Sequence, residues 1–356
     1  MTDNRPFVPH AATTLALMAA PLLVAQPALA QQDPIEPITS LASLDADWAA
    51  YDLEQTAATR EDAPLFPASI AAPALDQGDQ WSSTTEQYSI AVSRDEPVRD
   101  YASFGEDVKA IKWEVAGLFG YYTAINASKI FREDAVAPQF IKEGWFGADT
   151  KNVGVDKLAH FYSTYLMSEI VYGRLKHKVG DAPGIEVTAA VIGSGALLWS
   201  EFFDSIEGDG GWSWEDVAMN TAGAGFSVLR NSVPGLEEKI DYRLMIEPNS
   251  NIYTISGKEH FEQQRYFFAL KPAGFKQLEE TPLRFLEFHV GYHAKDFTDE
   301  DRLAGIQPKR HIFFGVGPNL SEIFFKRKKG KVARAADEVL DYFQLPYTAA
   351  HVHLTE

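Results

Sequence analysis

The hydrophobic pattern divides the chain into a helical part and a part with the alternation of β-strands. Between residues 101 and 235, apolar segments of helical length are separated by Gly, Pro and Asp. Within these segments, apolar positions three and four apart indicate helices. The sequence therefore predicts a central bundle of about four helices. Their ranges are 106–131, 155–176, 185–205, and a last segment that Ser213 caps and Pro234-Gly235 ends.

After residue 235 the hydrophobic period changes from the helical value to two. Within 286–293, apolar side chains occupy one face, while Glu287, His289 and His293 occupy the other. This alternation is typical of an antiparallel sheet with one face in water. We expect an α+β fold in which a small sheet packs on the bundle; a half-barrel and a sheet completed by another subunit are the alternatives. Strands are predicted at 242–247, 251–256, 263–271, 284–294 and 309–325, and a final helix at 332–345.

The N-terminal region has the features of an exported protein. Residues 11–25 form an apolar run, preceded by Arg5 and followed by Ala28-Leu29-Ala30. This pattern predicts a signal peptide that is cleaved after Ala30, with an uncleaved membrane anchor as the alternative. The next segment is rich in Ala, Pro, Asp, Glu and Ser, which is typical of disorder. The expected division is a signal peptide (1–30), a largely disordered lead-in (31–100), the bundle (101–235), the sheet (236–330) and a C-terminal helix and tail (331–356).

The amino-acid composition excludes several kinds of partner and several kinds of chemistry for this protein. The chain has 356 residues, a formal charge of -18 and no cysteine. An acidic balance of this size excludes nucleic acid as a general partner, because binding to phosphates needs a cationic surface. The absence of cysteine excludes disulfides, thiolate metal ligands, cysteine nucleophiles and a lipid-modified N-terminal cysteine. Together with the export signal, the composition predicts a protein of the periplasm or outer membrane of a Gram-negative bacterium.

Ionisable residues recur at helical spacing in three of the predicted helices. Each helix carries two polar residues three or four positions apart, and such a pair shares one helix face. We expect the three faces to turn toward one another inside the bundle. The pairs are Asp156 with His160, Glu201 with Asp204, and Asp216 with Asn220; together with Lys157 we call them the polar seam.

The polar seam has two interpretations. An imidazole and two carboxylates, from His160, Glu201 and Asp216, suit a divalent metal such as zinc or manganese. An open coordination position would activate water, and Glu201 or Asp216 would then act as the general base on an ester or phosphoester. The alternative is a structural network in which buried charges pair and fix the register of the bundle. We favour the network, because the sequence has no HExxH or comparable metal motif.

Three motifs of the seam occur in a recognisable order: DKxxHF at 156–161, E-x-x-DS at 201–205, and GWSW-x-D at 211–216, followed by Asn220 and Gly223. This series resembles the YfiM-like predicted periplasmic proteins, a family of unknown function. A looser similarity extends to VanZ-like membrane proteins. The resemblance covers about residues 150–235 and implies a cell-envelope location, but no reaction. Family members are often lipoproteins, whereas this chain has no cysteine, and the acidic turn at 207–211 is longer than in short members.

Aromatic and basic residues suggest contact with a membrane. Trp212 and Trp214 belong either to the core or to an interfacial aromatic belt. A basic cluster directly follows Phe324-Phe325, and such a segment anchors a protein at an anionic lipid surface or is a solvated loop. The cluster is Lys326, Arg327, Lys328 and Lys329. The leading hypothesis is a non-enzymatic envelope protein that contacts membrane lipids; a metal-dependent hydrolase of envelope lipid, phosphate or glycan substrates is the second.

Histidines recur in the predicted strands. His289 and His293 lie on one side of a strand, and His311 lies on a neighbouring strand. A metal site is one interpretation, while histidines exposed on the wet face of the sheet are the favoured one. His351 and His353 are expected in the C-terminal tail.

Overall fold

The computed structural model describes residues 103–355, except residues 209, 250–252, 255–256 and 327–329. The predicted signal peptide (1–30) and lead-in (31–100) lie outside the described residues.

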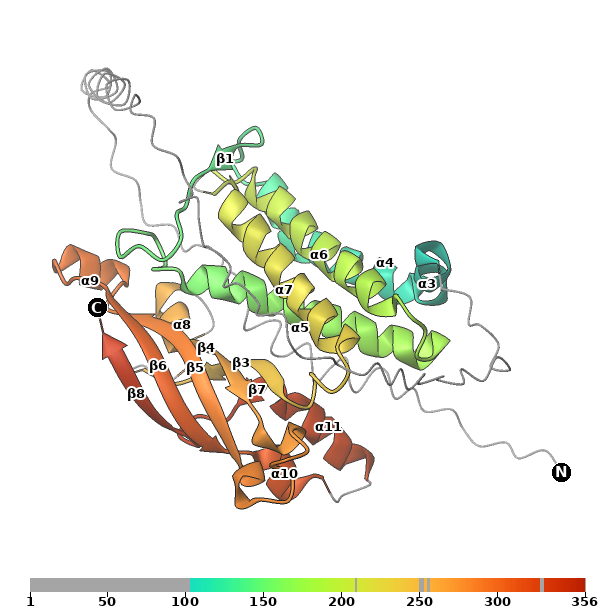
Figure 1. The fold of residues 1–356 in the computed structure, drawn as a ribbon. Helices are drawn as coiled ribbons and strands as arrows, with labels where there is room; N and C mark the ends of the chain where they lie inside the picture. The colour runs from blue at the N-terminus through green and yellow to red at the C-terminus, as the bar shows by residue number, and fades with distance from the viewer. Residues whose placement is uncertain (1–102, 209, 250–252, 255–256, 327–329, 356) are drawn as a thin grey trace, which may run out of the picture. The chain divides into compact units, whose positions relative to one another are not determined.

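The first part of the described chain is an α-helical bundle around one long helix, α5 (Figure 1). This helix packs against α6 and α7, and α4 packs against α6. The segment predicted as one helix over 106–131 forms two helices, because the chain turns at the buried Ile111. Ser213 caps α7 as expected, since its hydroxyl accepts a hydrogen bond from the backbone N–H of Asp216. The helices are α3 (Phe104–Ala110), α4 (Lys112–Ile130), α5 (Val155–Val179), α6 (Ile185–Asp204) and α7 (Trp214–Ser232).

The second part is a six-stranded sheet with the strand order β7-β3-β4-β5-β6-β8. Neighbouring strands are antiparallel, except that β7 pairs with β3 in parallel. Short helices, α8 to α11, connect or flank the strands (Figure 1). The strands are β3 (Ile240–Ile246), β4 (Gln264–Leu270), β5 (Leu286–Lys295), β6 (Lys309–Pro318), β7 (Phe343–Gln344) and β8 (Ala350–Thr355); a separate parallel pair is β1 (Phe140–Ile141) with β2 (Trp212–Ser213).

Several predicted elements of this second part need correction. Residues 253–254, from the strand expected at 251–256, are not in a strand, and the rest of that range lies outside the described residues. The strand expected at 309–325 ends at Pro318, because Asn319 caps the next helix, α10 (Leu320–Phe324). The last helix, α11 (Lys331–Leu340), is shorter than predicted. Within the expected helix and tail (331–356), residues 343–344 and 350–355 form the outer strands β7 and β8 instead.

The sheet packs on the bundle, as predicted. The ring of Tyr162 on α5 lies 5.6 Å from that of Tyr266 on β4, and the ring of Tyr165 lies 6.5 Å from that of Tyr242 on β3. Helix and strand residues share one hydrophobic core. The two parts therefore fold against each other through aromatic side chains of α5.

The sheet is curved, because its two outer strands are close together in the chain. Residues 345–349 alone join β7 to β8. The chain from Gln344 to Ala350 can span at most ~20 Å when fully extended. The first and last strands of a flat six-stranded sheet would lie ~24 Å apart. In agreement, Arg243 of β3 reaches across β4 and donates two hydrogen bonds of 3.0 Å to Glu287 of β5. We call the side with Arg243 and Glu287 the inner face and the opposite side the outer face.

The two faces of the sheet have the reverse of the expected environments. On the inner face, Glu287, His289 and His293 are at most 2% exposed, so the prediction of a wet polar face is wrong. Curvature of the sheet shields these three side chains from solvent. The exposed side chains are instead apolar and lie on the outer face of β4, β5, β6 and β8. They are Phe268, Leu270, Phe288, Val290, Ile312, Phe314, Val316, Val352 and Leu354, which we call the outer apolar patch.

Candidate functional site

The structure brings the three predicted metal-ligating residues together inside the bundle. Nδ1 of His160 on α5 lies 3.1 Å from Oε1 of Glu201 on α6, and Nε2 lies 3.5 Å from Oδ1 of Asp216 on α7. All three can offer a ligand atom within 4.8 Å of the others. Three helices thus converge on one imidazole, as the helical spacing of these residues predicts.

Lys157 holds a cluster of carboxylates next to this histidine. Its side chain is 1% exposed, and Nζ lies 2.7 Å from Oδ1 of Asp216 and 3.1 Å from Oδ2 of Asp156. It also donates a hydrogen bond to Glu143, which lies on the segment between β1 and α5. Glu143 was missed at the sequence level, because it stands outside every periodic segment. The ammonium group is therefore surrounded by acidic partners and stays charged although it is buried.

The other two seam residues bond to different partners. Asn220 accepts a hydrogen bond of 2.8 Å from the hydroxyl of Thr164, which links α7 to α5. Asp204, in the last turn of α6, accepts a hydrogen bond from Lys129 of α4. The seam therefore extends to α4, which no spacing in the sequence indicated.

Two glycines allow the helices to approach closely enough for these contacts. A Cβ atom at Gly223 of α7 would lie 2.1 Å from the backbone oxygen of Phe161 on α5. A Cβ atom at Gly193 of α6 would lie 3.0 Å from the backbone nitrogen of Ser168, also on α5. Both crossings need glycine, because any side chain would push the helices apart.

A small cavity of about 20 Å³ lies beside His160 and Glu201. The hydroxyl of Tyr122 on its wall is buried without a hydrogen-bond partner, and so is Nδ1 of His160, whose contact with Glu201 is not aligned as a hydrogen bond. Such a space holds about one water molecule or one ion. It has no room for a lipid, phosphoester or glycan substrate.

The charges of the seam shift its ionisation. Burial acts to lower the pKa of His160, but Asp216 and Glu201 outweigh it and raise the pKa to about 9. Burial raises the pKa of Glu201 to about 8, although His160 opposes this. Asp216 keeps a lowered pKa despite burial, because His160 and Lys157 stabilise its charge. At neutral pH the imidazole is thus a cation, and a metal ion would first have to displace its proton.

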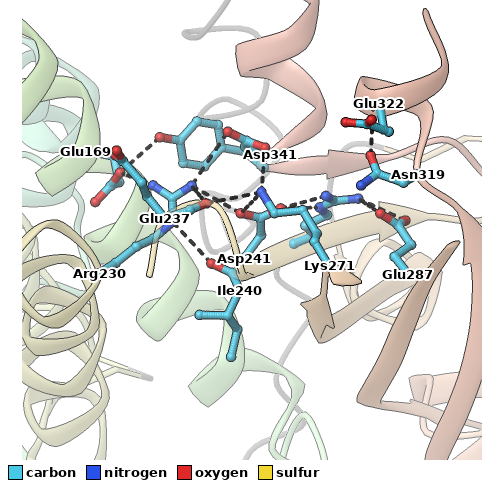
Figure 2. A network of polar contacts seen from close by, with 12 residues as sticks. Glu169, Arg230, Glu237, Ile240, Asp241, Lys271, Glu287, Asn319, Glu322 and Asp341 are labelled. Carbon is cyan, nitrogen blue, oxygen red and sulfur yellow. Dashed lines mark hydrogen bonds and ion pairs between the residues drawn. The ribbon is translucent and has the colours of Figure 1, made fainter. Parts of the chain in front are cut away.

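A second polar network, missed at the sequence level, joins the helices to the sheet (Figure 2). Arg230 of α7 donates a hydrogen bond of 2.9 Å to Glu169 of α5 and one of 3.1 Å to Asp241 of β3. Lys271 lies 2.8 Å from Asp241 and 3.2 Å from Asp341. Of these residues, Glu169, Arg230, Lys271 and Asp341 line an open cleft of about 950 Å³. Because the charges are mutually paired, we interpret the network as a structural link between bundle and sheet.

The site and fold define a class: an α+β protein whose bundle encloses a network of buried, paired charges. Residues 142–232 match the model of a family described as a predicted periplasmic lipoprotein (DUF2279). The matched segment contains all the residues of the polar seam and is similar to a family of unknown function, which supports a periplasmic or envelope location. No curated protein and no solved structure matches the chain.

Proposed function

We propose that this protein is a non-enzymatic envelope protein that lies on a membrane, and that the polar seam fixes its helical bundle. One observation carries the proposal: α4, α6 and α7 expose almost no charge. Lys112, the first residue of α4, is the one exposed charged residue among all residues of these three helices. The exposed residues that follow form the uncharged helical face: Trp113, Ala116, Gly117, Gly120, Thr123, Ala124, Ser128 and Ile130 on α4; Val187, Val191, Trp199 and Phe202 on α6; Trp214, Ala218, Thr221, Ala222, Gly225, Leu229 and Ser232 on α7.

This polarity is the reverse of that of a water-soluble bundle. Surface helices of soluble proteins carry charged residues on the face that meets solvent. Here the ionisable residues Glu201, Asp216 and Arg230 are all buried instead. The sheet shows the same reversal of polarity, because its outer apolar patch is exposed while the polar residues of its inner face are buried. Exposed apolar surfaces of this extent mark contact with a membrane or a partner.

Lipid is the favoured occupant of the uncharged helical face because the exposed residues of three helices carry almost no charge and aromatic residues lie near the ends of the face. Trp113 begins α4, Trp214 begins α7, and Trp199 lies near the end of α6, positions typical of residues at a membrane interface. By length and composition, α6 is the one described helix that could cross a membrane, but it is 56% buried in the protein. We therefore propose that the bundle lies in the interface and does not span the bilayer.

The proposal also includes the family, the cleavage of the signal peptide, the attachment to the outer membrane and the role of the basic cluster. The seam motifs support a YfiM-like protein, and the export signal supports cleavage after Ala30 and attachment at the outer membrane. Lys326, with its ammonium 2.9 Å from Glu322, begins the basic cluster, while Arg327, Lys328 and Lys329 lie outside the described residues. Their binding to anionic lipid stays a prediction. A hydrolase is not proposed, because the cavity at His160 is too small for its substrates.

Vesicle flotation tests the proposal. The purified chain is mixed with phosphatidylethanolamine–phosphatidylglycerol vesicles and centrifuged in a density gradient. We expect the wild type to float with the vesicles and the double variant Val191→Glu/Leu229→Glu to stay below, because two charges on this face oppose contact with acyl chains. The control Ala304→Glu adds a charge at an exposed site elsewhere and should float. A wild type that ignores the vesicles, or that forms dimers which the double variant abolishes, would show that lipid is not the occupant.

A further inference from the structure

Three histidines from three neighbouring strands meet on the inner face of the sheet. His293 of β5 is the cross-strand partner of His311 on β6, and His353 of β8 lies beside both. Each can offer a ring nitrogen within 4.8 Å of the other two. The expectation that His353 belongs to a free tail is wrong, since β8 completes the sheet and carries it to this cluster.

The ring nitrogens of the cluster are poorly satisfied by protein groups. Nε2 of His293 lies 3.2 Å from Nδ1 of His353, and Nδ1 of His311 lies 2.8 Å from the hydroxyl of Thr355. Two further nitrogens, Nδ1 of His293 and Nε2 of His311, are buried without a hydrogen-bond partner. Buried unpartnered polar atoms are costly, and an ion bound at Nε2 of His311 would offset the cost at that atom.

The three imidazoles are held in the form that binds metals. Burial, together with the charge of Arg265, lowers the pKa of His293 far below its usual range. Burial is also the main cause that lowers the pKa of His311 and of His353. All three rings are therefore neutral at pH 7, and their lone pairs are available to a cation.

We propose that His293, His311 and His353 form a binding site for a divalent transition metal such as zinc. Three imidazoles with an open fourth position are a common zinc ligand set. Nitrogens that bind zinc tetrahedrally at ~2.0–2.1 Å lie ~3.4 Å from one another, which the His293–His353 pair already matches. The ring of His311 is stacked on that of His293 and has to rotate before Nε2 can reach the metal. The hydroxyl of Thr355, next to Nδ1 of His311, then orients the His311 ring. His353 is exposed, so solvent and ions can reach the site.

Arg265 competes with the metal ion. Its Nη1 lies 3.0 Å from Nε2 of His293, and it is also paired with Glu247. In the metal-free protein the guanidinium donates a hydrogen bond to the nitrogen that the ion needs. Metal binding therefore requires the hydrogen bond between Arg265 and His293 to break, while the ion pair between Arg265 and Glu247 is kept.

Zinc titration of the full chain tests the site. After removal of metals with a chelator, we expect calorimetry to show one tightly bound Zn²⁺ per chain. His353→Gln should weaken binding at least tenfold, because it removes a ligand. Arg265→Met should strengthen binding, because it removes the competing donor. Co²⁺ in place of Zn²⁺ should show the intense visible absorption of a tetrahedral site.

Two control variants separate this site from others. His177→Gln changes an exposed histidine of α5, and His160→Ala removes the histidine of the polar seam; both should bind Zn²⁺ as the wild type does. Circular dichroism shows whether His353→Gln, on an outer strand, keeps its fold. No zinc binding by the wild type, or equal affinity in folded His353→Gln, would overturn the proposal. Loss of binding in His160→Ala alone, with its circular dichroism spectrum unchanged, would assign the metal to the seam instead.

Discussion

Nζ of Lys157 on α5 lies 2.7 Å from Oδ1 of Asp216 on α7. The same carboxylate oxygen lies 3.5 Å from Nε2 of His160, one turn further along α5. A single acidic side chain thus holds two cations of the facing helix, which explains why its pKa is lowered although burial acts to raise it. The charges of the seam are therefore mutually dependent, and removing one of them leaves the others without compensation.

Replacement of Lys157 by Met should strongly destabilise the fold. The change leaves Asp156, Asp216 and Glu143 without their shared cation, and breaking a buried pair in this way costs about 3–5 kcal/mol. Urea unfolding followed by circular dichroism measures the loss. Lys151→Met, at an exposed site before α5, is the matched control and should change the unfolding free energy by less than about 0.5 kcal/mol. Equal stability of the two variants would show that the buried ammonium is not needed.

Stability should fall as pH rises through the range in which His160 titrates. The pKa of this imidazole is raised from 6.5 to about 9 in the folded state, so the native protein binds its proton more tightly than the unfolded chain does. This contribution is complete below pH 6.5 and is lost as pH rises to about 9; the shift corresponds to about 3 kcal/mol. Glu201, with a pKa raised from 4.5 to about 8, acts in the same direction between those two values.

The variant His160→Gln checks the assignment of this pH dependence. Because His160 acts to lower the pKa of Glu201, the comparison is made in a Glu201→Gln background, where His160→Gln should lose the decline in unfolding free energy above pH 6.5. A wild type whose stability is constant or rises over this range would contradict the proposed charge state of the seam.

The helix crossing at Gly223 should not tolerate a methyl group. Gly223→Ala would place Cβ against the backbone oxygen of Phe161, and such overpacking costs about 1–3 kcal/mol. Gly225, two residues further on, is exposed, and a Cβ atom at this position would have no neighbouring atom within 4 Å. Gly225→Ala should therefore raise stability by about 0.5–1 kcal/mol, because alanine favours the helix. Thermal unfolding of the two variants gives opposite shifts if the close crossing is correct.

The inner face of the sheet should depend on Arg243. Its guanidinium bonds to Asp241 at 2.6 Å and to both carboxylate oxygens of Glu287, and all three side chains are buried. Arg243→Met leaves the buried Glu287 without its guanidinium partner, while Asp241 keeps Arg230 and Lys271, and the change should cost about 3–5 kcal/mol. Arg334→Met, at an exposed position of α11, provides the comparison. If the two variants unfold at the same urea concentration, the inner face is more hydrated than the structure indicates.

Helical spacing was sufficient to predict most of the bundle and the meeting of His160, Glu201 and Asp216. Such residues are placed by a local period, and the period can be read from one helix at a time. Glu143 and Arg230 could not be found in this way. Their partners are brought together by tertiary contacts, for example between Arg230 and Asp341, whose side chains approach to 3.5 Å from distant parts of the chain.

For the sheet, the prediction from sequence failed for a different reason. Alternation separated His289 and His293 from their apolar neighbours correctly, but a period of two is the same for either orientation of the sheet. The buried side is decided by curvature, which depends on the short strands β7 and β8. Phe343–Gln344 is too short to produce a recognisable pattern, and His351 and His353 alternate with apolar residues in a segment that resembled a tail.

The five-residue link between β7 and β8 has a practical consequence. A protease that cuts within residues 345–349 would remove no core side chain, yet it would free β8 to leave β6. The exposed backbone groups of β6, flanked by Ile312 and Phe314, would then be a template for strands of other molecules. Limited cleavage within this loop is therefore expected to make the protein aggregate.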